Sequence, residues 1–130
     1  MRYLTEGFAL GALGRGKPIA QFLGPRADAD PAVVQWVEIR PRGGEFEVVL
    51  NAVHDVGGEH FLDLWEFPLD DPEEDGLGRV LAGADSALGA MKEAEEQTPA
   101  VRHRWVNLGV VQDEYRDYIR AGRPLSWPTG

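Results

Sequence analysis

The stretch VVQWVEIRPRGGEFEVVLNAVHDVGGEHFLDLWEF, residues 33–67, decides the fold. It contains three runs rich in β-branched and aromatic residues: Val33–Arg40, Glu45–His54 and His60–Phe67. The pairs Gly43-Gly44 and Gly57-Gly58 separate these runs, and a two-residue hairpin turn needs positive φ, which glycine adopts at little cost. The pattern therefore predicts two consecutive β-hairpins that share the middle strand.

Placing each glycine pair at the centre of its turn sets the register of the predicted sheet. In the first hairpin Ile39 then faces Val48, and Trp36 faces Asn51. One face is predicted as the core because its side chains are all apolar: Val37, Ile39, Phe46, Val48, Leu50, Trp65 and Phe67. The other face mixes apolar and polar side chains: Val34, Trp36, Val53, Leu62, Leu64, Glu38, Asn51 and Glu66. We expect either a terminal segment of the chain or another molecule to cover this mixed face.

The flanking sequence is predicted to be mostly helical. Apolar spacing indicates a helix over residues 4–13, and Pro18 suits the first position of a second helix over residues 18–23. A third helix is predicted over residues 72–97, with Asp71 as its cap and a break near residues 83–85. Residues 102–108 are a possible fourth strand, and residues 111–119 have the spacing of a last helix.

These elements together predict one α+β domain over residues 1–130. Its sheet is a three- to four-stranded antiparallel meander, and N-terminal and C-terminal helices pack on one face of that sheet. The tail, residues 124–130, is expected to be loose or to dock through Trp127.

Composition narrows the classes of function. The chain has 130 residues and no cysteine, which excludes disulfides, thiol nucleophiles and cysteine-ligated metals. It has no apolar run of the roughly 18 residues that a membrane span requires. Its N-terminus also lacks the apolar run and cleavage site of a signal peptide, so we expect a cytoplasmic, bacterial-type soluble protein.

The net charge of −9 is concentrated in the middle of the chain. Residues 45–99 contain fifteen Asp or Glu and only two basic residues, Arg79 and Lys92. Such a field repels phosphate backbones and anionic lipid and attracts cationic surfaces. Among the arginines after residue 100, Arg116 and Arg120 each follow an aspartate by three residues and can be neutralised locally, and the chain as a whole has no net basic footprint. We therefore expect a basic protein partner, and neither nucleic acid nor membrane.

The sequence carries no complete catalytic or metal-binding motif. Residues 11–17 have the spacing of a phosphate-binding loop, but Pro18 stands where a Mg²⁺-binding hydroxyl is needed. His54, Asp55 and His60 cluster near Gly57-Gly58, yet neighbouring strand positions point to opposite faces, which separates His54 from the other two. We therefore predict no metal, no cofactor and no catalytic residue.

The leading functional hypothesis is a non-catalytic protein-binding module. Trp36 and Leu64 would anchor a basic partner, and four acidic residues would steer it: Glu38, Glu66, Asp70 and Asp71. In size, charge and outline the chain resembles the small acidic α+β proteins that neutralise toxins in bacteria, which implies an immunity- or antitoxin-like role.

Two alternatives from other classes stay open. The first is a small-ligand-binding or hydrolytic enzyme with a cleft between the sheet and the 72–97 helix. It would use Glu38, Glu66 or Asp63 together with His60 or His103. The second is a structural protein that self-associates as a homodimer through the face around Trp36.

Overall fold

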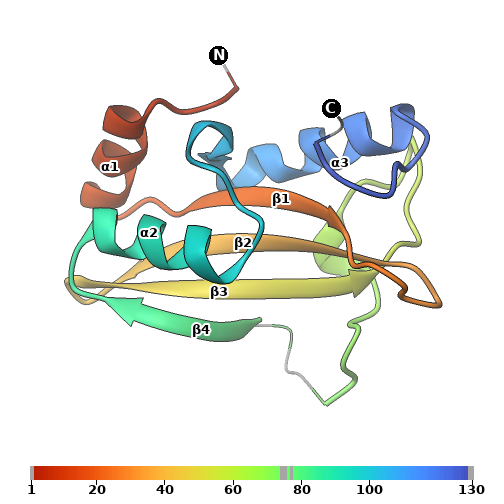
Figure 1. Ribbon diagram of the computed structural model, residues 1–130, viewed down its shortest axis with the longest axis horizontal. Helices are drawn as coiled ribbons and strands as arrows, with labels where there is room; N and C mark the ends of the chain where they lie inside the picture. Colours follow the sequence, from red (N-terminus) through yellow and green to blue (C-terminus); the bar gives the residue numbers. More distant parts are fainter. Residues whose placement is uncertain (1, 74–75, 77, 129–130) are drawn as a thin grey trace.

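The computed structural model describes residues 2–73, 76 and 78–128, and these form an antiparallel sheet of five strands with three α-helices (Figure 1). The sheet order is β4-β3-β2-β1-β5. Its strands are β1 (Ile19–Pro25), β2 (Val33–Arg42), β3 (Glu45–His54), β4 (Arg79–Ala84) and β5 (Val106–Asn107). The helices are α1 (Glu6–Gly14), α2 (Ala87–Gln97) and α3 (Val111–Arg120). Three short 3₁₀ helices, η1 (Leu64–Glu66), η2 (Arg102–Arg104) and η3 (Leu108–Val110), complete the described part of the chain. The α+β class and the antiparallel sheet are confirmed, whereas the strand number and several elements differ from the prediction.

The first hairpin has the predicted register. Ile39 pairs with Val48 and Trp36 pairs with Asn51. Gly43 and Gly44 form the turn with φ values of 58° and 86°. Residues that have a Cβ adopt such positive φ values only at an energetic cost. The glycine pair therefore fixes which residues of β2 and β3 share a face.

Two hydrophobic cores lie on the two faces of the sheet. On one face, Val37, Ile39 and Val48 pack with buried residues of α1 and α2. On the other, Val34, Trp36 and Val53 pack with α3 and with Leu64 and Phe67. Helices thus cover both faces, which corrects the prediction that they lie on one. The mixed face is covered by the chain itself, the first of the two expected possibilities.

The predicted second hairpin is wrong. Residues 60–67 form no strand and instead contain η1, and β3 pairs along its other edge with β4. Gly57 explains the difference, because a Cβ at this position would lie 2.5–2.6 Å from Phe67 Cζ, Phe61 O and Tyr115 Oη. The glycine is therefore needed for close packing against α3 rather than for a hairpin turn. Phe67 consequently lies in the core that contains Trp36, and not on the predicted opposite face.

The helix predicted over residues 72–97 begins only at Ala87. Ser86 caps it, since its Oγ accepts a hydrogen bond of 3.0 Å from the Gly89 backbone N–H. Residues 79–84 form the edge strand β4, so the predicted break near residues 83–85 coincides with the end of this strand, just before α2. The Asp71 side chain accepts from the Glu73 backbone N–H at 2.9 Å. Positions 74, 75 and 77 of the predicted helix lie outside the described residues.

The helix predicted over residues 18–23 is also wrong, because this segment is β1, with β2 on one side and β5 on the other. Both faces of β1 are buried, so its sequence lacks the polar alternation that marks a half-exposed strand. The possible strand over 102–108 is reduced to β5, with η2 before it. The first and last predicted helices are confirmed as α1 and α3.

Candidate functional site

Residues 56–73, here called the acidic segment, run over the core that contains Trp36 and return to the edge of β3. Two backbone hydrogen bonds hold its end, from His54 N to Pro68 O at 2.8 Å and from Asp70 N to Ala52 O at 3.1 Å. Its Phe67 ring packs edge-on against Tyr115 of α3 at 5.5 Å between centroids. The segment is thus attached both to the sheet and to α3.

The beginning of the acidic segment is fixed by a polar cluster on α3 and just after it. Gly57 N–H donates to Tyr115 Oη at 3.1 Å, while the Tyr115 hydroxyl donates to the carboxylate of Asp55. Arg123 completes the cluster with a 2.9 Å bond to Asp55. Burial, and then the Asp55 carboxylate, raise the pKa of Tyr115 above its usual range, so this hydroxyl stays protonated. These contacts attach Asp55 and Gly57 to the C-terminal part of the chain.

The carboxylates of the acidic segment differ in their partners. The segment contains six Asp or Glu and no Lys or Arg. Glu59 pairs with Arg120 at 2.8 Å and Asp70 with Arg26 at 2.6 Å, and the arginine hydrogen bond lowers the pKa of each carboxyl. The other four form no ion pair with any residue that the structure describes: Asp63, Glu66, Asp71 and Glu73. The segment therefore keeps an uncompensated negative charge.

Most basic side chains of the protein are already occupied. Within the described residues, nine of the thirteen Lys and Arg side chains form ion pairs with carboxylates of the same chain. The arginines after residue 100 all belong to this group. For example, Arg104 and Arg2 both bind the buried carboxylate of Glu114, at 2.9 and 2.8 Å. The acidic excess of the sequence is thus carried by the unpaired carboxylates, four of which lie on the acidic segment.

The same segment exposes large apolar side chains. Trp65 is 41% exposed and Phe61 44% exposed, and Val56 is also exposed. Exposed aromatic side chains surrounded by charged ones are typical of protein-binding surfaces. Trp65 was predicted to lie in the core on the other face of the sheet, so sequence reasoning missed it. The error follows directly from the wrong second hairpin, since no other signal in residues 60–67 indicates which side chain points outward.

The structure buries three of the six predicted binding residues. Trp36, Leu64 and Glu38 are each at most 1% exposed. Trp36 Nε1 donates to Glu38 Oε1 at 3.0 Å, and Arg40 Nε donates to Glu38 Oε2 at 2.7 Å. Trp36 and Leu64 do lie in the same core, as the predicted faces require, but beneath the chain rather than at its surface. The expectation that these side chains are accessible is therefore corrected.

The other three predicted binding residues lie at or near the surface. Glu66 and Asp71 are exposed, and Asp70 is half-buried beside Arg26. The structure thus groups Glu66, Asp70 and Asp71 on one segment with Trp65, while Glu38 is separated from them in the interior.

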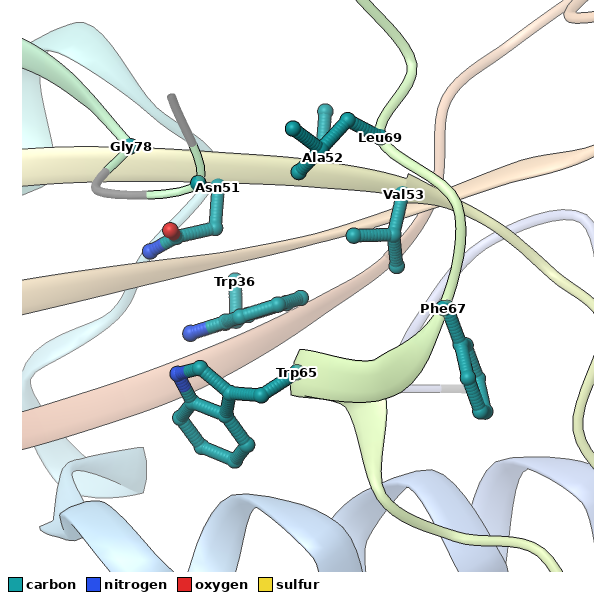
Figure 2. Close-up of a pocket in the computed structure, with 9 residues that line it drawn as sticks. Trp36, Asn51, Ala52, Val53, Trp65, Phe67, Leu69 and Gly78 are labelled. Atoms are coloured by element: carbon teal, nitrogen blue, oxygen red, sulfur yellow. The ribbon is translucent and has the colours of Figure 1, made fainter. Parts of the chain in front are cut away.

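A pocket opens beside Trp65. This tryptophan pocket has a volume of about 160 Å³ and includes in its lining Trp36, Asn51, Val53, Trp65, Phe67 and Leu69. Figure 2 shows the two indole rings lying against each other, with the Asn51 side chain reaching from β3 toward Trp36. The ring centroids are 5.2 Å apart with an angle of 61° between the planes.

Asn51 brings a polar group into this pocket. It is 6% exposed, and its Nδ2 has no hydrogen-bond partner among the described residues. A buried donor without a partner costs about 1–3 kcal/mol. A Cβ at Gly78 would lie 2.7 Å from Asn51 Oδ1, so the backbone at residue 78 closes one side of the amide.

The geometry also bears on the residues of the alternative enzyme hypothesis. Glu38 lies on the sheet face opposite α2, so it cannot line a cleft between the sheet and that helix. Ala90, Met91 and Ala94 of α2 pack directly on the sheet and fill the space where that cleft was expected. His60 lies on the acidic segment and His103 in η2, on different parts of the fold.

Across the described residues, no group of three or more His, Asp or Glu side chains is arranged to hold a metal ion. None of the helices in that part of the chain has the length and apolarity to cross a bilayer.

Comparisons of the chain with protein-family models, with curated proteins and with solved structures find no match.

Proposed function

We propose that this protein is a non-catalytic binding module that docks a basic protein on the acidic segment. One observation carries the proposal. Four unpaired carboxylates lie on the same segment as two exposed aromatic side chains, although most arginines of the protein are neutralised internally. A partner that neutralises an excess charge and buries aromatic side chains gains both fast association and stable contact.

Trp65 is the proposed anchor. Its ring rests against the buried Trp36 on one side, and 41% of the residue is accessible on the other. A tryptophan held by its neighbours loses little conformational freedom when a partner covers it, which is typical of residues that dominate interface energetics. Trp36 now has a supporting role beneath Trp65, in place of the anchoring role that the sequence suggested.

Glu66 and Asp71 are the proposed steering residues. Both are exposed and neither forms an ion pair with the described residues, so their field reaches solvent. Charges at the rim of an interface change mainly the association rate and its dependence on salt. Asp70 contributes less because Arg26 neutralises it at 2.6 Å.

The test is affinity capture from an extract of the cells that express the chain, followed by kinetics with the purified partner. Wild-type protein should retain a basic protein at low salt. Trp65→Ala should weaken its binding at least about 30-fold, the effect of losing about 2 kcal/mol at a hot spot. The matched control is Phe8→Ala, which removes an exposed aromatic side chain from α1 and should leave affinity unchanged.

A second pair of variants distinguishes the effect of charge on the acidic segment from the effect of the protein's net charge. Glu66→Gln with Asp71→Asn should slow association several-fold at low salt. Asp85→Asn with Glu96→Gln removes the same charge from exposed positions just before and on α2, which covers the other face, and should slow it much less. Equal binding by Trp65→Ala and wild type, or equal slowing by both charge pairs, would contradict the proposal.

A further inference from the structure

The size of the tryptophan pocket limits what it can hold. Its volume is about 160 Å³. An apolar protein cavity of about 150 Å³ accommodates one benzene molecule, whereas pockets for drug-sized ligands start at about 300 Å³. The pocket therefore fits one six-membered ring and excludes nucleotides and oligosaccharides.

The walls of the pocket favour an aromatic ring. Two indoles meet there at an angle of 61°, and Val53, Phe67 and Leu69 add apolar surface. Aromatic rings prefer edge-to-face or offset contacts with other rings, and the tilted indoles offer both a face and an edge. Trp65 is partly exposed, so a ring can enter from solvent.

Asn51 indicates that the ring of the ligand carries a hydrogen-bond acceptor. Its buried Nδ2 group needs an acceptor, and the described residues supply none. The Trp36 indole does not compete for the ligand's acceptor, because its Nε1 already donates to Glu38 at 3.0 Å. A neutral acceptor is favoured over an anion, since the acidic segment carries unpaired carboxylates, among them Glu66 next to Trp65 in the sequence.

The geometry points to a binding site for a phenol, whose ring lies against Trp36 and Trp65 and whose oxygen accepts the free N–H of Asn51. This inference does not depend on the docking of a basic protein. A phenol can be a free small molecule or the tyrosine side chain of another protein, and the two sources present the same chemistry to the pocket.

The experiment compares ring compounds that differ in one group. Uniformly ¹⁵N-labelled wild-type protein is titrated with p-cresol, toluene or benzoate, while the side-chain amide of Asn51 and the indole N–H signals of Trp36 and Trp65 are followed by NMR. p-Cresol should shift all three signals and bind about tenfold tighter than toluene, the difference expected for one buried hydrogen bond of about 1.4 kcal/mol. Benzoate should cause no shift.

Variants assign the preference to Asn51. Asn51→Leu should bind p-cresol and toluene equally, while Trp65→Ala should lose both. Phe8→Ala, which removes an exposed ring of α1 that does not line the pocket, should bind both as wild type does. The wild-type Asn51 signal tests the inference even if Asn51→Leu does not fold.

Two blocked tripeptides distinguish the source of the phenol. Binding of Lys-Tyr-Lys more tightly than p-cresol, with Lys-Phe-Lys weaker, assigns the pocket to a tyrosine of a basic partner. Binding of p-cresol without the peptide assigns it to a free phenol. No shift with p-cresol up to its solubility limit, or equal affinity for p-cresol and toluene in wild type, overturns the inference.

Discussion

Replacing Gly57 by alanine tests how the acidic segment is attached to the rest of the fold. The added Cβ would lie 2.5 Å from Phe67 Cζ, 2.6 Å from the Phe61 backbone oxygen and 2.6 Å from Tyr115 Oη. None of these is the far end of a flexible chain, because both rings are packed in the core and the third atom belongs to the backbone. Forcing extra volume into a packed site costs about 1–3 kcal/mol. With three such contacts we expect the upper part of this range, about 2–3 kcal/mol.

The matched control is the neighbouring residue. A Cβ at Gly58 would meet nothing within 4 Å, so Gly58→Ala should change the free energy of unfolding by less than about 0.5 kcal/mol. A Gly-Gly hairpin turn would give another result, because both glycines would then need positive φ and both substitutions would be costly.

Urea unfolding followed by tryptophan fluorescence and by circular dichroism measures both variants. The expected result is a lower midpoint for Gly57→Ala with an unchanged slope, and wild-type behaviour for Gly58→Ala. A loss below about 0.5 kcal/mol for Gly57→Ala, or equal losses for both variants, would refute the packing described for residues 55–67.

Three further substitutions address other parts of the structure. Trp36→Ala should destabilise the fold by about 3–5 kcal/mol because Trp36 is buried, whereas Trp65→Ala should cost less than about 1.5 kcal/mol; similar losses in thermal unfolding would contradict their different burial. Burial of Glu95 opposes its ionisation, but hydrogen bonds from Arg102 and Trp105 outweigh it and lower its pKa below 4.5, so its stabilising effect is present above that pH and is lost as the pH falls. Glu95→Gln should therefore cost about 1–2 kcal/mol at pH 7 and progressively less as the pH falls below 4.5, and a pH-independent loss in urea unfolding would count against the ion pair. Gly24→Ala places a Cβ 2.5 Å from Trp127 Cβ at a φ of +82°, so it should detach Trp127 from Phe22 and Tyr118; unchanged protease cleavage after residue 120 would argue against this docking.

The parts of the fold that sequence reasoning found are those with a local physical signal. Gly43-Gly44 sits between two alternating runs, and its turn chemistry fixed the register of β2 and β3. The apolar spacing of residues 111–119 gave α3, whose buried Tyr115 and Tyr118 lie on one side of the helix. In both cases the residues that determine the structure are near one another in sequence.

The parts that failed depend on contacts between distant residues. Gly57-Gly58 resembles Gly43-Gly44 in sequence, but the packing of Gly57 against Tyr115 and Phe67 decides its conformation. β1 is buried on both faces and so has no polar alternation, and the apolar residues of β4 around its one glycine, Gly83, imitate a diluted helix. The position of Trp65 depends on such contacts between distant residues. Sequence reasoning therefore identified the acidic residues Glu66 and Asp71 but placed Trp36, and not Trp65, at the surface.

Hydrogen exchange of the complex with its captured basic partner tests the central claim most directly. Docking on the acidic segment predicts slower exchange of backbone amides in residues 56–73, with amides of α1 and α2 unchanged. Slower exchange confined to α1 and α2, with residues 56–73 exchanging as in the free protein, would contradict the account.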